Sequence, residues 1–276
     1  MTIRKMCGGV GLGAGSGLAI TGDSRAVGVG DGWAWLVFPP HAAAISIGAA
    51  MRMADQRWNL EIRPERGGRI VSLRLDGEEL LEQGIGVDQP TASGFVEGGA
   101  FGWDEMVPNL EPTDTLPDHG EAWRLPWEVL DDERMRCAGR LVPWELERRI
   151  SLGEVVVVNY RYRNVGDVPQ PAYWCAHPLF KYEPNMEVSA RLPPLGEGAS
   201  TKVFLPRGSL DRVSLRWRSG AAVQVDWDLN LAPDVAIWAC NGDLGGYRQI
   251  AVEPSWTRSE LAPGDTYSWW LRITPL

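Results

Sequence analysis

The sequence predicts an all-β protein built as a large antiparallel β-sandwich. Residues 58–63, 156–163 and 213–218 alternate apolar and polar side chains, which is the period of a half-buried strand. Between such segments lie turns rich in Gly, Pro, Asn and Asp, and after residue 57 no long segment shows a helical period. These two observations set the fold class, but they do not give the order of the strands.

Two further segments support the strand prediction. Residues 69–75 (RIVSLRL) are followed by Asp76-Gly77, a pair that favours the positive φ angles of a tight hairpin. The last apolar segment, TYSWWLRITP at 266–275, predicts a strand close to the C-terminus.

The composition excludes several classes of function. The 276 residues carry a formal net charge of −9, whereas proteins that bind nucleic acids or anionic membranes need a basic surface. The four cysteines are scattered, with no CxxC pair, so neither a zinc site nor a disulfide framework is predicted. We expect reduced thiols in a cytoplasmic protein, with Cys175 and Cys240 buried in apolar segments.

The N-terminal residues differ from the rest of the chain in composition and in periodicity. They are rich in Gly and Ala and show no sustained period until Met51 and Met53, which directly precede the first clear strand pattern. We therefore predict that residues 1–52 are a poorly ordered or non-native extension and that residues 53–276 form the domain. A secretory signal and a membrane span are the alternatives, but glycines dilute the first and Pro39-Pro40 interrupts the second.

Three segments place a titratable group beside turn-forming and aromatic residues. They contain His119 in a polar loop, His177 after an apolar strand, and Glu253 at the end of another apolar strand. Each has a structural alternative: a loop histidine, a core histidine, and a carboxylate paired with Arg248 or Arg258. A buried carboxylate without any partner would be costly, so Glu253 must face water, a partner or a substrate.

Taken together, the sequence resembles the aldose 1-epimerase or galactose mutarotase-like family over residues 57–276. The resemblance rests on GGRIVSLRLDGEELL at 67–81, on His119-Gly120, on the histidine of AHPLF at 176–180, and on Glu253-Pro254. No one of these motifs is specific, but they occur in the family's order.

The resemblance implies a galactose mutarotase-like sandwich with a sugar site on an open face. Glu253 would be the general base, His177 the general acid and His119 a second hydrogen-bond donor to the sugar. Such a pair suits mutarotation, which removes a proton from the anomeric hydroxyl while protonating the ring oxygen. No metal or other cofactor is required. The substrate contacts that we expect besides these three come from Arg124, Asp104, Glu105, Trp123 and Trp256.

The sequence departs from the family pattern at two places. Where the family has a sugar-binding arginine, residues 98–112 offer Asp104 and Glu105, and Arg124 is a candidate replacement. The family's sugar-binding aspartate has no clear counterpart among Asp226, Asp228 and Asp234.

Three hypotheses of function remain open at this point. The first is an isomerase acting on a monosaccharide or a sugar phosphate, and the second is a non-catalytic carbohydrate-binding domain of the same fold. The third is a lyase or another epimerase acting on an acidic sugar, which would require denser basic residues. The sequence does not give the oligomeric state.

Overall fold

The computed structural model describes residues 50–276, so the predicted N-terminal extension lies outside the described residues except for its last three positions. The first strand begins at Met51, two residues before the predicted start of the domain, and pairs with the strand that follows it. Within residues 50–276, no helix is long and apolar enough to cross a membrane.

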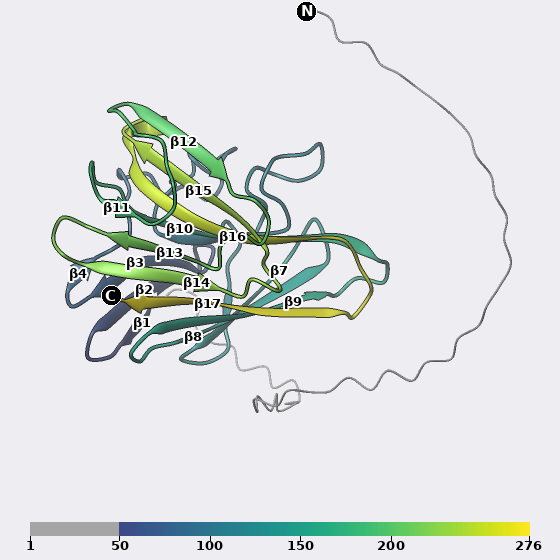
Figure 1. Cartoon of the computed structure of the whole chain (residues 1–276). Helices are drawn as coiled ribbons and strands as arrows, with labels where there is room; N and C mark the ends of the chain where they lie inside the picture. The colour runs from purple at the N-terminus through teal and green to yellow at the C-terminus, as the bar shows by residue number, and fades with distance from the viewer. Residues whose placement is uncertain (1–49) are drawn as a thin grey trace, which may run out of the picture. The chain divides into compact units, whose positions relative to one another are not determined.

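Two antiparallel sheets form the fold, as the alternating segments predict (Figure 1). The first sheet contains, in spatial order, β1 (Met51–Ala54), β2 (Trp58–Arg63), β3 (Arg69–Leu75), β5 (Trp103–Met106), β10 (Gln170–Lys181), β16 (Arg248–Leu261), β15 (Asp234–Asn241) and β12 (Ala199–Phe204). A short strand, β4 (Glu78–Glu79), pairs with β3 through the predicted hairpin, where Asp76 and Gly77 both have positive φ.

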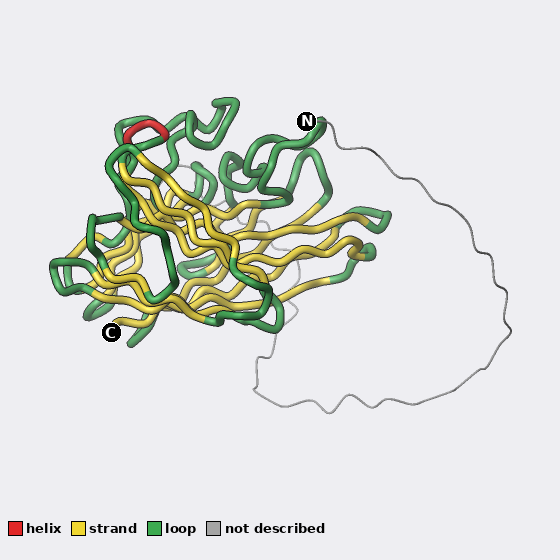
Figure 2. The backbone as a smooth tube through the Cα atoms, turned by 45° about the horizontal axis from the view of Figure 1, so that its top comes forward, coloured by secondary structure: helices red, strands yellow, loops and turns green. Residues whose placement is uncertain are grey.

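The second sheet contains β11 (Glu187–Val188), β13 (Arg212–Arg216), β14 (Ala222–Trp227), β17 (Thr266–Pro275), β9 (Val156–Asn164), β8 (Trp144–Ser151), β7 (Arg134–Ala138) and β6 (Glu128–Val129). The predicted C-terminal strand is confirmed as β17. Figure 2 shows in red the one helical turn of the described residues, η1 (Leu244–Gly246).

The main core fills the space between the two sheets. Alternate residues of each strand point into it, as in β8 and β9, where every second side chain is buried. Its centre is aromatic: the Trp269 ring contacts Trp174 and Trp256, with ring centroids 4.7 and 5.0 Å apart. Burial of such large rings supplies much of the free energy that holds a sandwich together.

The other face of the first sheet, which we call the outer face, is partly covered by loops. A second apolar cluster forms there from residues of β5, β10, β15 and β16 and from Phe95, Ala100 and Trp123 of the covering loops. A backbone hydrogen bond holds one loop against this face: the Leu179 carbonyl of β10 accepts from the Glu82 N–H at 2.8 Å. These loops turn part of an open sheet face into a cavity.

The thiols of the described residues are free and buried, as expected for Cys175 and Cys240. Burial raises the pKa of the Cys137 thiol to about 12 and raises that of Cys175 as well. Neither side chain is therefore a thiolate near neutral pH.

Candidate active site

His177 and Glu253 meet on the outer face because β10 and β16 pair in register. Cys175 lies opposite Ser255 and Leu179 opposite Ala251, so the intervening His177 faces Glu253. The distance from His177 Nε2 to Glu253 Oε1 is 3.4 Å, and both side chains are buried. Residues 76 positions apart in the sequence thus lie in direct contact.

Lys202 completes this group from β12, at the edge of the same sheet. Its Nζ lies 2.7 Å from Glu253 Oε2. Ala236 of β15 lies opposite Glu253 on one side and Phe204 on the other. Lys202 precedes Phe204 by two residues in β12, and the short side chain of Ala236 leaves room for Lys202 to reach the Glu253 carboxylate. Lys202 is not predicted from the sequence, because its contact with Glu253 depends on a strand order that local patterns do not reveal.

His119 approaches from the loop that follows β5. Its φ angle is +58°, and the next residue, Gly120, has a φ of +72°. A Cβ atom at Gly120 would lie 2.2 Å from the Val107 carbonyl oxygen, so only glycine fits there. Two successive left-handed residues turn the backbone sharply, which accounts for the His-Gly dipeptide.

Asp118 fixes the orientation of the His119 ring. Asp118 Oδ1 lies 2.8 Å from His119 Nδ1, which leaves Nε2 for another partner. Phe95 stacks on His119 at 4.7 Å and meets the His177 ring edge-on at 5.2 Å. The centroids of the two histidine rings are 5.6 Å apart.

A cavity of about 200 Å³ joins these side chains. It is lined by Phe95, Val96, Ala100, Leu110, Glu111, His119, His177, Lys202, Trp238, Leu244, Tyr247, Gln249 and Glu253. We call it the catalytic cavity, after the role that is proposed for it below. All three residues that the sequence predicts as the chemical centre therefore line one cavity.

Several lining side chains have buried polar atoms without a hydrogen-bond partner among the described residues. These atoms are His177 Nδ1 and Gln249 Oε1, and Glu253 Oε1 has only the long 3.4 Å contact with His177 Nε2. Gln249 is only 4% exposed and was not foreseen from the sequence. Because an unsatisfied buried polar atom costs about 1–3 kcal/mol, such a cluster favours a polar ligand in the cavity.

The charges of the cavity are set by burial and by the contacts within it. Burial alone would raise the pKa of Glu253, but His177 and Lys202 outweigh it and lower that pKa below its usual value. Burial lowers the pKa of His177, and the Glu253 carboxylate only partly restores it. For Lys202, burial lowers the pKa but Glu253 more than reverses this, so its pKa is raised. At neutral pH the site holds a carboxylate and an ammonium group beside a largely neutral imidazole.

Trp123 and Arg124 lie behind the cavity rather than in its lining. Trp123 is buried, and its Nε1 donates a hydrogen bond to the Asp118 carbonyl oxygen at 3.2 Å. Arg124 lies over the Trp123 ring at 4.3 Å. Trp123 therefore contacts the loop that carries His119, Arg124 contacts Trp123, and neither residue lines the cavity.

Asp104, Glu105 and Trp256 are also placed outside the cavity. Asp104 neighbours His177 in the sheet but pairs with Arg69 at 2.7 Å. Glu105 points into the main core, where it pairs with Arg148 at 3.1 Å and accepts hydrogen bonds from Tyr160 and Trp174. Trp256 is part of the aromatic core. The sequence pattern suggested ligand contacts for these three side chains, whereas their partners are other protein groups.

The alternative pairings considered for Glu253 are not found. Arg248 contacts Asn241 and Glu197, and Arg258 contacts Tyr267. Within residues 50–276, no group of three or more His, Cys, Asp or Glu side chains is arranged to hold a metal ion.

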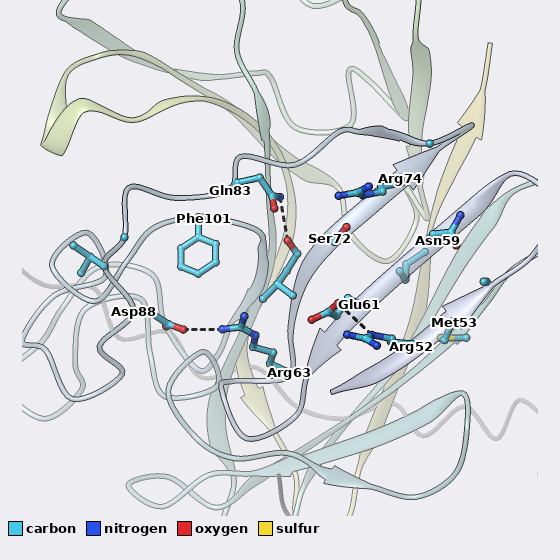
Figure 3. Close-up of a pocket in the computed structure, with 16 residues that line it drawn as sticks. Arg52, Met53, Asn59, Glu61, Arg63, Ser72, Arg74, Gln83, Asp88 and Phe101 are labelled. Atoms are coloured by element: carbon cyan, nitrogen blue, oxygen red, sulfur yellow. Dashed lines mark hydrogen bonds and ion pairs between the residues drawn. The ribbon is translucent and has the colours of Figure 1, made fainter. Parts of the chain in front are cut away.

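A larger depression of about 750 Å³ lies on the outer face of β1–β3 (Figure 3). Its arginines are paired with acidic side chains: Arg52 with Glu61, Arg63 with Asp88, and Arg74 with Glu79. None of its described lining residues has a buried polar atom without a partner. Size alone thus does not make it the better candidate site.

Comparisons with known proteins were made by sequence and by structure. No family model matches the chain, and no curated protein sequence matches it. Solved structures do match. A Synechocystis protein aligns with a TM-score of 0.67 at 16% identity, covering 86% of this chain and 99% of its own.

Two further matches have descriptive names. A protein of Escherichia coli K12 proposed to be an aldose 1-epimerase aligns with a TM-score of 0.65 at 15% identity, covering 83% of this chain and 99% of its own. A galactose mutarotase-like protein of Lactobacillus casei aligns with a TM-score of 0.62 at 15% identity, covering 83% of this chain and all of its own. This chain therefore has the β-sandwich fold of the aldose 1-epimerase and galactose mutarotase-like proteins, as its sequence motifs indicate.

Proposed function

We propose that this protein is an aldose 1-epimerase, an isomerase that interconverts the anomers of a sugar by general acid–base catalysis. The observation that carries the proposal is the buried contact between Glu253 and His177 at the wall of the catalytic cavity. A carboxylate and an imidazole in hydrogen-bonding range of one small space are the two groups that ring opening needs.

The proposed reaction opens and recloses the sugar ring. Glu253 removes the proton of the anomeric hydroxyl, while protonated His177 delivers a proton to the ring oxygen. The C1–O5 bond breaks to give the open-chain aldehyde. Rotation about C1–C2 presents the other face of the carbonyl, and the two proton transfers then run in reverse. Atoms and charges balance without any other reactant.

The remaining side chains prepare this pair. Lys202 keeps Glu253 ionised and holds one of its oxygens, leaving the other for the substrate. His119, whose Nδ1–H donates to Asp118, presents Nε2 as an acceptor for a sugar hydroxyl rather than as the donor expected from the resemblance. Gln249, whose Oε1 has no partner among the described residues, accepts a hydrogen bond from a sugar hydroxyl.

The test is the rate of anomer interconversion for a panel of aldoses, measured by polarimetry. Glu253→Gln preserves the shape of the side chain but removes the base, so we expect the catalysed rate to fall on the order of a hundredfold or more. Glu260→Gln, on the exposed end of the same strand, is the matched control and should keep the wild-type rate. Equal rates for wild type and Glu253→Gln would remove Glu253 from the mechanism.

A carbohydrate-binding domain without activity is the competing function. Nothing in binding alone requires an ionised carboxylate and an imidazole to be buried in contact, because each group costs free energy to remove from water. This cost favours a chemical role for the pair.

A further inference from the structure

A second pocket adjoins the catalytic cavity at Glu253. It has a volume of about 570 Å³, and Leu110, Glu111 and Glu253 line both spaces. We call it the side pocket. The catalytic cavity, at about 200 Å³, is smaller than the roughly 300–1,000 Å³ of most ligand sites, whereas the side pocket falls within that range. A ligand that reacts at Glu253 therefore has more room beside the catalytic cavity than inside it.

Asn109 gives the side pocket an unsatisfied polar group. Its side chain is only 9% exposed, and its Nδ2 donates to the backbone oxygens of Glu111 and Pro117 at 2.9 and 2.8 Å. Its Oδ1 is buried and has no partner among the described residues. Both donor bonds fix the amide in the wall of the side pocket, and its Oδ1 lacks the hydrogen-bond donor that a buried acceptor requires.

The rest of the lining combines hydroxyl groups with an exposed aromatic ring. Tyr173, Ser255 and Thr257 come from the neighbouring strands β10 and β16. Phe204, on β12, is 73% exposed, the highest value among the large apolar side chains described as exposed. An aromatic face beside hydrogen-bonding groups matches a sugar ring, which has an apolar C–H face and a rim of hydroxyls.

The charge of the side pocket selects against anionic ligands. Of the described residues that line it, Glu111, Asp234 and Glu253 are acidic, and none is Lys or Arg. Two of these acids are already paired: Asp234 with Arg207 at 2.6 Å, and Glu253 with Lys202, whose Nζ also lies 5.7 Å from the centre of the Phe204 ring. Glu111 has no ion pair among the described residues, and a phosphate or carboxylate group in the side pocket would meet its like charge in a partly buried space.

We propose that the side pocket is a second sugar subsite, so that the substrate is a neutral oligosaccharide whose reducing-end residue reacts at Glu253. This inference rests on the proposed anomerase activity. The anomeric end of the glycan enters the catalytic cavity, and the next residue lies in the side pocket against Phe204 and Asn109. Hexose phosphates and acidic sugars are poorer substrates on this account.

The first experiment compares kcat/KM for anomer interconversion of glucose, galactose, glucose 6-phosphate and a panel of α- and β-linked neutral disaccharides. We expect at least one disaccharide to exceed the monosaccharide at its reducing end about tenfold. A panel in which no disaccharide exceeds its monosaccharide, or in which glucose 6-phosphate is the best substrate, overturns the proposal.

The second experiment locates the preference. Phe204→Ala removes the exposed ring, and we expect the ratio of disaccharide to monosaccharide kcat/KM to fall about twofold to twelvefold, the factor that corresponds to about 0.5–1.5 kcal/mol of ring contact. Leu141→Ala, a similarly exposed apolar side chain in a loop after β7, should leave the ratio unchanged. An unchanged ratio in Phe204→Ala contradicts the subsite.

Titration calorimetry separates failure of the subsite from failure of the proposed function. If wild type accelerates no anomerisation but binds maltotriose more tightly than glucose, and Phe204→Ala removes that difference, the subsite holds and the catalytic proposal fails. If wild type is active and no oligosaccharide preference is seen in rate or binding, the subsite fails and the activity stands.

Discussion

At the scale of single residues, Glu253 is the feature on which the chemistry depends. It is 2% exposed and contacts both a histidine and a lysine. These contacts lower its pKa despite burial, so the negative charge persists at the pH where a base is needed. In the proposed mechanism the two neighbours have different tasks: His177 exchanges a proton, and Lys202 stabilises the charge of Glu253.

The pH dependence of His177 follows from its burial. Because its pKa is lowered from the usual value of about 6.5, only a minority of the free enzyme carries protonated His177 at neutral pH. We therefore expect kcat/KM to fall with rising pH through a pKa below about 6.5. NMR titration can follow this directly, since the chain has only three histidines.

In Glu253→Gln the same titration should move to still lower pH, because the carboxylate favours the imidazolium. A His177 titration that is unchanged by this substitution would contradict the contact between the two side chains.

Lys202 is predicted to act as a positioning residue. In Lys202→Met, Glu253 loses one of the two groups that lower its pKa, so the acid limb of the pH–rate profile should shift to higher pH. A merely structural role would lower the rate equally at all pH values. Arg207→Met, in the turn after β12, removes a more exposed ion pair and serves as the control that leaves the acid limb in place.

At the scale of elements, the His119 loop shows how backbone strain places a functional group. His119 and Gly120 are both left-handed, and the Asp118 side chain accepts from the Phe95 N–H at 2.8 Å, which ties this loop to the other covering loop. Burial raises the pKa of Asp118, but these hydrogen bonds outweigh it and the net pKa is lowered. The carboxylate therefore stays charged and keeps the ring oriented.

Gly120→Ala tests this arrangement. The added Cβ has no room beside the Val107 carbonyl, so the loop must shift, and we expect a loss of about 1–3 kcal/mol in the free energy of unfolding together with a raised KM. Gly153→Ala, where a Cβ meets nothing within 4 Å, is the matched control. Urea denaturation and steady-state kinetics measure both effects, and wild-type values for Gly120→Ala would contradict the strain argument.

Strands and turns are predicted correctly where the pattern that specifies them lies within one short segment of the sequence. The alternating segment 58–63 has the bounds of β2, the apolar segment 266–275 has those of β17, and Asp76-Gly77 forms the predicted hairpin. Asp104 and Glu105 show the limit: adjacent residues of a strand face opposite sides, and only the fold decides which side is core. Lys202 and Gln249 could not be predicted as site residues, because the pairing of distant strands, and not a local sequence pattern, brings them to the cavity.

At the scale of the whole molecule, the two sheets are joined by a polar contact as well as by the apolar core. Glu105 of β5 pairs with Arg148 of β8 across the sandwich, and both side chains are fully buried. Burial raises the pKa of Glu105 to about 7, although Arg148 opposes the shift. Removing one partner would leave the other as an uncompensated charge.

Arg148→Met should therefore lower the free energy of unfolding by about 3–5 kcal/mol. A raised folded-state pKa stabilises the protein below the unfolded pKa, near 4.3, and this contribution is lost as the pH rises through the folded value. In the folded protein Glu105 is mostly neutral at pH 5 and mostly charged at pH 8, so the loss of Arg148 should destabilise the protein more at pH 8. Denaturant melts at the two pH values measure this difference. A pH-independent loss would contradict the role of Glu105. Arg57→Met, which breaks a fully exposed pair, should change stability little.

The central claim is that Glu253 is the base of a sugar anomerase, and the rate of anomer interconversion for wild type beside Glu253→Gln tests it most directly. The account predicts acceleration of at least one neutral sugar by wild type and a loss on the order of a hundredfold in the variant, with Glu260→Gln unaffected. An absence of acceleration for every aldose and oligosaccharide tested, or an equal rate in Glu253→Gln, would contradict it.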